Sequence, residues 1–176
     1  MCLLNDLLKR FAKTNSAIIL DKEGNVAHIP TLQEYIDWVR AQIGDIARYE
    51  ISWDELKAEL ATLGIRCMVS DAPDLRLFYT DEPSLIKMIP FLTYPADYYV
   101  AELDIDCDDY SEWAAADASK IFHVNGVLQS WGWTPAGFHA FNMIKVHPDK
   151  WLLFEPNAGF DFAGEAFGIG VNGYLP

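Results

Sequence analysis

Residue types that together can carry out nucleophilic acyl transfer occur in the second half of the chain. Cys107 lies in the acidic stretch LDIDCDDYSEWAAADASK, His139 opens the apolar stretch HAFNMIKV, and Glu155 and Asn157 end the stretch WLLFEPN. A thiol nucleophile needs a histidine that takes its proton, and that histidine needs a polar group that orients it. Cys107 and His139 are therefore the candidate nucleophile and base.

The aspartates around Cys107 have two possible roles. Carboxylates raise the pKa of a neighbouring thiol, whereas the first turn of a helix lowers it. The alternation of acids suggests a calcium loop, but an EF-hand needs glycine at its sixth position and glutamate at its twelfth, where this chain has Asp109 and Ala115. We therefore expect no metal and no cofactor, with a looser divalent-ion site as an alternative. Asp106, Asp108 and Asp109 are expected to cap the helix or to shape what enters the site.

The elements that must position these residues follow an α+β order. A helix is predicted over roughly 108–121, followed by strands in the stretches GVLQSWGW, GFHAFNMIKV and KWLLFEPN. Upstream, capping-box spacing predicts helix starts at Thr31 and Ser52, and further strands are predicted at 66–70 and 76–80. At the N-terminus, leucines at helical spacing predict a helix, and residues 17–29 predict a strand pair.

The strand pattern leaves the partner of His139 open. A hairpin with a three-residue loop at 147–149 pairs residue 139 with Asn157, and a register shifted by two pairs it with Glu155. Both alternatives keep the partner on the face of the histidine, because side chains alternate along a strand.

The joint pattern resembles the transglutaminase-like superfamily of papain-type cysteine enzymes. The resemblance covers about residues 95–160 and rests on DCDDY, on His139 with Phe141 in GFHAF, and on Glu155-Pro156. DCDDY is similar to bacterial and phage members whose cysteine is flanked by acids. The family usually has aspartate as its third residue, so Glu155 departs from the pattern and is favoured over Asn157 by the motif alignment. The resemblance implies a helix that carries the cysteine, packed on an antiparallel sheet in a core over residues 91–176, after a helical or mixed region over 1–90.

The implied function is cysteine-dependent acyl transfer or amide hydrolysis through a thioester on Cys107, with His139 as base. An acidic rim of Asp106, Asp108 and Asp109 would favour a peptide or amide substrate that is basic or carries an amine. The alternative is an inactive binding or structural module on the same scaffold, for instance in a phage particle. A cell-wall peptidase of the NlpC/P60 type fits less well, since its aspartate-cysteine pair is typically followed by Ser-Gly.

The bulk composition restricts the class of partner and compartment. The 176 residues carry a net charge of −13, and both nucleic acid and anionic membranes repel such a surface. Three cysteines without a CxxC pair predict neither a disulfide framework nor a zinc site. With no signal peptide or membrane-spanning run expected, the sequence predicts a cytoplasmic protein, one that could also be assembled into a virion.

Overall fold

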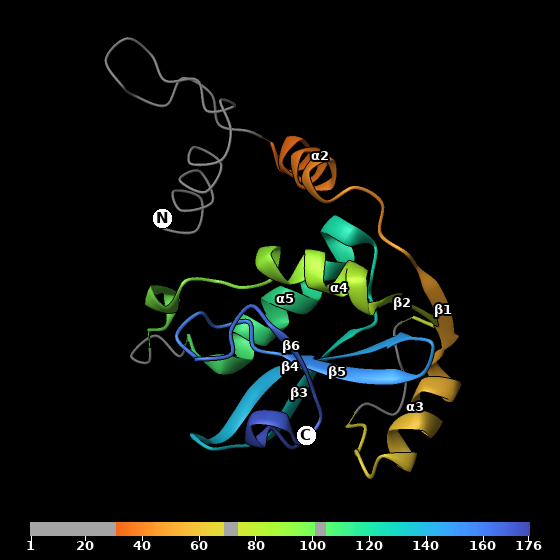
Figure 1. Ribbon diagram of the computed structural model, residues 1–176, viewed down its shortest axis with the longest axis vertical. Helices are drawn as coiled ribbons and strands as arrows, with labels where there is room; N and C mark the ends of the chain where they lie inside the picture. The colour runs from red at the N-terminus through yellow and green to blue at the C-terminus, as the bar shows by residue number, and fades with distance from the viewer. Residues whose placement is uncertain (1–30, 69–73, 101–104) are drawn as a thin grey trace. The chain divides into compact units, whose positions relative to one another are not determined.

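Residue contacts divide the chain into two compact units, Met1–Gln42 and Ile43–Pro176. The structure, a computed structural model, describes residues 31–68, 74–100 and 105–176 (Figure 1). Helix α2 (Leu32–Ile43) begins with the predicted capping box, in which the Glu34 backbone N–H donates to Thr31 Oγ1 and the Thr31 N–H donates to Glu34 Oε2. The predicted N-terminal helix and the strand pair at 17–29 lie outside the described residues.

A six-stranded sheet organises the second unit, with β4 (Gly137–His147) at its centre. Strands β3 and β5 pair with β4 in antiparallel orientation, and β6 continues the sheet beyond β5. β2 pairs in parallel with the C-terminal end of β4, along the same edge of β4 as β3. β1 pairs with β2. The bounds of these strands are β1 Tyr49–Ser52, β2 Arg76–Asp81, β3 Val127–Thr134, β5 Lys150–Phe154 and β6 Ala166–Gly168.

This topology confirms the α+β prediction and corrects one part of it. The sheet is mixed and not antiparallel, because Thr80 and Asp81 of β2 run parallel to Val146 and His147 of β4. A hairpin forces antiparallel pairing, but β2 and β4 are separated by α5 and β3, so their orientation is free of that constraint. The boundary predicted between residues 90 and 91 lies inside the second unit, because β2 belongs to the same sheet as β4.

Helix α5 (Cys107–Phe122) packs against β3 and β4 (Figure 1). It extends one residue beyond the predicted range at each end. Three of the residues predicted for its inner side, Ala114, Ala118 and Ile121, are buried, while Trp113 is half-buried. The apolar residues of β4 complete this core, since Ala140, Ile144 and Val146 are also fully buried. Burial of this face fixes the helix on the sheet and places its first residue near the start of β4.

Two further helices flank the strands that precede α5. Helix α3 (Trp53–Thr62) begins with the predicted capping box of Ser52 and Glu55, and α4 (Glu82–Met88) is capped by Asp81. The strand predicted at 66–70 is wrong over its described part, because residues 66–68 have no strand partner there. Short 3₁₀ turns occupy Ile89–Phe91, Ala96–Tyr98 and Val171–Gly173. Within the described ranges, no helix is both long enough and apolar enough to span a bilayer.

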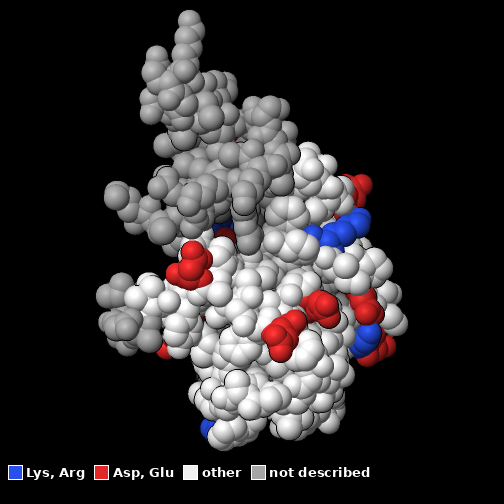
Figure 2. Space-filling model, turned by 60° about the vertical axis from the view of Figure 1, so that its left-hand side comes forward, with Lys and Arg blue, Asp and Glu red and all other residues white. Residues whose placement is uncertain are grey.

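The acidity of the chain is dispersed on the face shown in Figure 2. Acidic and basic side chains stand there as separate groups, with broad uncharged surface between them. Among the described residues on that face, the charged side chains form no continuous surface.

Candidate active site

Cys107 is the first residue of α5, and its thiol lies against the backbone of β4. Asp106 caps the helix: its carboxylate accepts from the Asp108 N–H at 3.3 Å, and its own N–H donates to Asp109 Oδ2 at 3.0 Å. The half-buried Cys107 Sγ accepts a hydrogen bond from the Ala140 N–H at 3.4 Å. The thiol therefore lies beside the residue that follows His139.

His139 is held by a buried carboxylate. Its Nε2 lies 2.8 Å from Glu155 Oε2, and both side chains are almost fully enclosed. Because an ionised carboxylate only accepts, a neutral imidazole in this bond carries its proton on Nε2 and has its lone pair on Nδ1. In the described part of the chain, Glu155 is the only hydrogen-bond partner of the imidazole. That tautomer is the one a general base requires.

Two further donors fix Glu155. The Asn157 backbone N–H donates to Oε1 at 2.9 Å, and the Tyr174 hydroxyl donates to Oε2 at 3.2 Å. Burial and the negative charge of Glu155 raise the pKa of Tyr174, so its hydroxyl remains a donor. Glu155 therefore has three donors, which is how a buried carboxylate is stabilised without a full counter-charge.

Aromatic rings enclose the imidazole. Phe160 lies over His139 with ring centroids 4.5 Å apart and a 30° interplanar angle. Tyr174 approaches edge-on at 6.4 Å. These rings exclude water from the His139–Glu155 bond, and exclusion of water strengthens that bond.

The structure separates the two candidates for the third residue. Glu155 bonds to His139, whereas Asn157 Oδ1 accepts from the Gly159 N–H at 2.9 Å and so closes a turn. The hairpin has the predicted three-residue loop, since Val146 pairs with Lys150 and Asn142 with Phe154. Continued along the strands, that register sets residue 139 opposite Asn157. The longer glutamate side chain nevertheless reaches the histidine diagonally on the same face.

The surroundings of Cys107 favour the protonated thiol. Burial raises the pKa of Cys107, and the carboxylates of Asp106 and Asp108 raise it further, against the opposing Ala140 N–H. The helix start does not offset these effects. At neutral pH Cys107 is therefore a protonated thiol, and any reaction at its sulfur would require loss of that proton.

The three predicted rim acids differ in what they do. Asp106 and Asp109 are occupied in the capping box, while Asp108 is exposed. The Asp106 and Asp108 carboxyls share a hydrogen bond, which lowers the pKa of Asp106 and raises that of Asp108. Asp106, Cys107 and Asp108 also bring one potential ligand atom each within 4.8 Å of one another. Asp106 already accepts a hydrogen bond as the cap of α5. This cluster is therefore less suited to bind a metal ion.

Sequence reasoning missed the residues that support His139. Tyr174 and Phe160 lie beyond the last predicted strand, in segments with no periodic pattern. Gly170 and Gly173, at φ of 80° and 78°, bring this tail back to the sheet. The spacing of these glycines predicts a turn, but it does not predict which part of the sheet the tail contacts.

The chain was compared with protein-family models, with curated proteins and with solved structures, and none of the three comparisons gives a match.

Proposed function

We propose that this protein carries out cysteine-dependent acyl transfer or amide hydrolysis, with Cys107 as nucleophile and His139 as base, on a transglutaminase-like core. One observation carries the proposal: the thiol at the start of α5 accepts from Ala140, directly after a histidine whose Nε2 is held by buried Glu155. The thiol thus contacts the backbone next to a histidine that already has the carboxylate partner used in thiol catalysis, and this supports the proposal.

The first half of the reaction forms a thioester. His139 Nδ1 takes the Cys107 proton as the sulfur attacks the substrate carbonyl, and Glu155 stabilises the imidazolium that results. The oxyanion of the tetrahedral intermediate is placed near the Cys107 backbone N–H. The imidazolium then protonates the leaving amine, the carbon–nitrogen bond breaks, and the acyl group remains on sulfur.

The second half releases the acyl group. Water or a second amine attacks the thioester and gives its proton to His139, and the Cys107 sulfur leaves and is reprotonated. Water as acceptor gives hydrolysis, and an amine gives transamidation. Because the thiol is protonated at rest, the histidine acts as a base during attack and does not form a resting ion pair.

A peptide or amide substrate with a basic or amine-bearing group fits the acids at the start of α5. Asp108 is the exposed member of that group, so it is the one we expect to meet the substrate. If Asp108→Asn leaves the preference between lysine-bearing and neutral amides unchanged, this part of the proposal is removed.

The second candidate is an inactive scaffold that binds a partner, for instance within a phage particle. The carboxylates that raise the pKa of Cys107 favour it, because they lower the thiolate fraction on which thiol chemistry depends.

Acylation by a p-nitrophenyl ester, read by peptide mass spectrometry, separates the two candidates. Cys67, a half-buried cysteine outside this site, serves as an internal control in the same molecule. For an enzyme we expect Cys107 to acylate faster than Cys67 and His139→Ala to slow it by about 100-fold or more. If His139→Ala leaves the Cys107 rate unchanged, the catalytic proposal is rejected and the scaffold is retained.

A further inference from the structure

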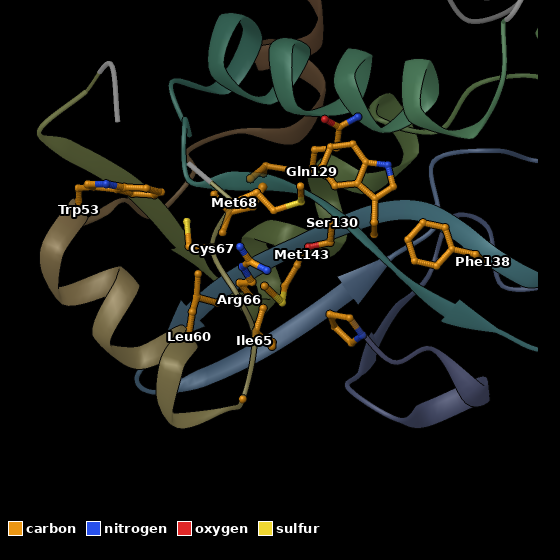
Figure 3. A pocket seen from close by; sticks show the side chains of 15 residues that line it. Trp53, Leu60, Ile65, Arg66, Cys67, Met68, Gln129, Ser130, Phe138 and Met143 are labelled. Carbon is orange, nitrogen blue, oxygen red and sulfur yellow. The ribbon is translucent and has the colours of Figure 1, made fainter. Parts of the chain in front are cut away.

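A cavity of about 660 Å³ lies beside the outer edge of β3, within the second unit (Figure 3). Its walls come from α3, from the segment 64–68 that follows it, and from β3 and β4. The lining is mainly apolar and includes Trp53, Leu60, Trp131 and Met143. This volume suits two or three apolar side chains of a ligand.

The backbone of β3 is available along this cavity. Trp133 exchanges two hydrogen bonds of 2.9 Å with Leu175, so its N–H and C=O point away from β4. Because these directions alternate with period two, the N–H and C=O of Gln129 and Trp131 point outward as well. Among the described residues, neither of these outward pairs has a backbone partner. The Leu175 bridge shows that this edge accepts an antiparallel chain.

Two polar side chains that line the cavity, buried Ser130 and exposed Arg66, have no partners among the described residues. Ser130 is buried, and its hydroxyl makes no hydrogen bond to any described residue. Arg66 makes no ion pair in the described part of this acidic chain, although its side chain extends among the lining residues toward Ser130 and Met143 (Figure 3). An exposed cation in the wall of a mainly apolar cavity attracts an anionic group that enters beside it.

The apolar surface continues past the cavity. Trp131, Trp133 and Phe138 are 41%, 64% and 63% exposed, and the last two contact each other edge-on. Exposed aromatic residues next to a free sheet edge indicate a surface that a partner covers.

We propose that an extended peptide binds here by adding a strand to the outer edge of β3. Its backbone pairs with Gln129 and Trp131, alternate apolar side chains enter the cavity, and a carboxylate of the peptide faces Arg66. The Gln129 side chain donates to the Asp108 carbonyl at 2.9 Å, which links this edge to the first turn of α5. The inference does not depend on the proposed catalysis, because binding requires no reaction.

The test uses the full chain with Cys107→Ala, which prevents turnover, and the peptide acetyl-LTLTLE-amide as probe. Two further peptides have the same sequence with N-methyl groups on every second residue. One carries them on the first, third and fifth residues, and the other on the second, fourth and sixth. Only the set that faces β3 pairs with it, so we expect one N-methylated peptide to bind like the parent and the other to bind at least about tenfold more weakly. Amide exchange is expected to slow at Gln129 and Trp131 and to stay unchanged at Leu128 and Ser130, which already bond within the sheet.

Arg66→Ala tests the charge. We expect it to weaken binding of the glutamate peptide by up to about fivefold and to leave a glutamine version unaffected. Lys87→Ala, an exposed cation outside the cavity, is the matched control and should change neither affinity. Equal binding of the two N-methylated peptides, unchanged exchange at Gln129 and Trp131, or no binding of the parent peptide at about 1 mM would each overturn the proposal.

Discussion

Tyr174→Phe is expected to destabilise the protein through the loss of one donor to the buried Glu155 carboxylate. Glu155 is fully buried and receives three hydrogen bonds, of which the one from Tyr174 measures 3.2 Å. A hydrogen bond to a charged group contributes about 1.5–3 kcal/mol, and this length is at the weak end for an O–H donor. We therefore expect a loss of about 2 kcal/mol in the free energy of unfolding.

Tyr110→Phe is the matched control for this change. Tyr110 is also fully buried and donates one hydrogen bond, at 2.7 Å, but its acceptor is the neutral carbonyl of Pro95. Burial, helped by the charge of Asp97, raises the pKa of Tyr110 to about 12, so both hydroxyls are donors. Loss of a neutral hydrogen bond costs about 1 kcal/mol, roughly half the value expected at Tyr174.

Urea denaturation followed by tryptophan fluorescence measures both variants against the wild type. Equal losses for Tyr174→Phe and Tyr110→Phe would mean that the carboxylate charge adds nothing. A Tyr174→Phe loss within about 0.5 kcal/mol of zero would refute the reasoning that Glu155 depends on three donors.

The remaining predictions concern the start of α5 and the carboxylate behind His139. The pKa of Cys107 is raised in the folded state, so its contribution to stability is complete below the unfolded thiol pKa of about 8.5 and is lost as the pH rises above that value. Urea midpoints measured between pH 7 and 10 should therefore fall less steeply with pH in Cys107→Ser than in the wild type. Asp108→Asn removes a carboxylate that raises this pKa, so iodoacetamide should label Cys107 at lower pH than in the wild type, and an unchanged profile would show that the charge does not reach the thiol. Asp106→Ala removes the helix cap and should cost about 1 kcal/mol in thermal unfolding, whereas Asp108→Ala, at an exposed site outside the cap, should change stability by less than about 0.5 kcal/mol. Glu155→Gln should slow acylation of Cys107 by about 100-fold or more with the fold retained, because glutamine cannot stabilise the imidazolium of His139 by charge; a rate within a factor of about three of the wild type would contradict the assigned role.

Local sequence determines much of the frame of the candidate site. The capping boxes at Thr31 and Ser52 form as predicted, because each uses side chains only three residues apart. Apolar stretches predict β3, β4 and β5, and the loop at 147–149 has the predicted length. Cys107 starts a helix because Asp106 and Asp109 satisfy the free N–H groups of its first turn.

The tertiary structure decides what depends on segments far apart in the chain. Hairpin register alone sets His139 opposite Asn157, yet Glu155 is its partner, because side-chain length and the donors from Asn157 and Tyr174 select a diagonal contact. The parallel pairing of β2 with β4 and the cavity beside β3 likewise have no periodic signal. Such contacts form only when packing brings distant segments together, so the local sequence of either segment does not predict them. Sequence therefore determines that Cys107 begins a helix, and tertiary packing determines which groups surround its thiol and which groups hold His139.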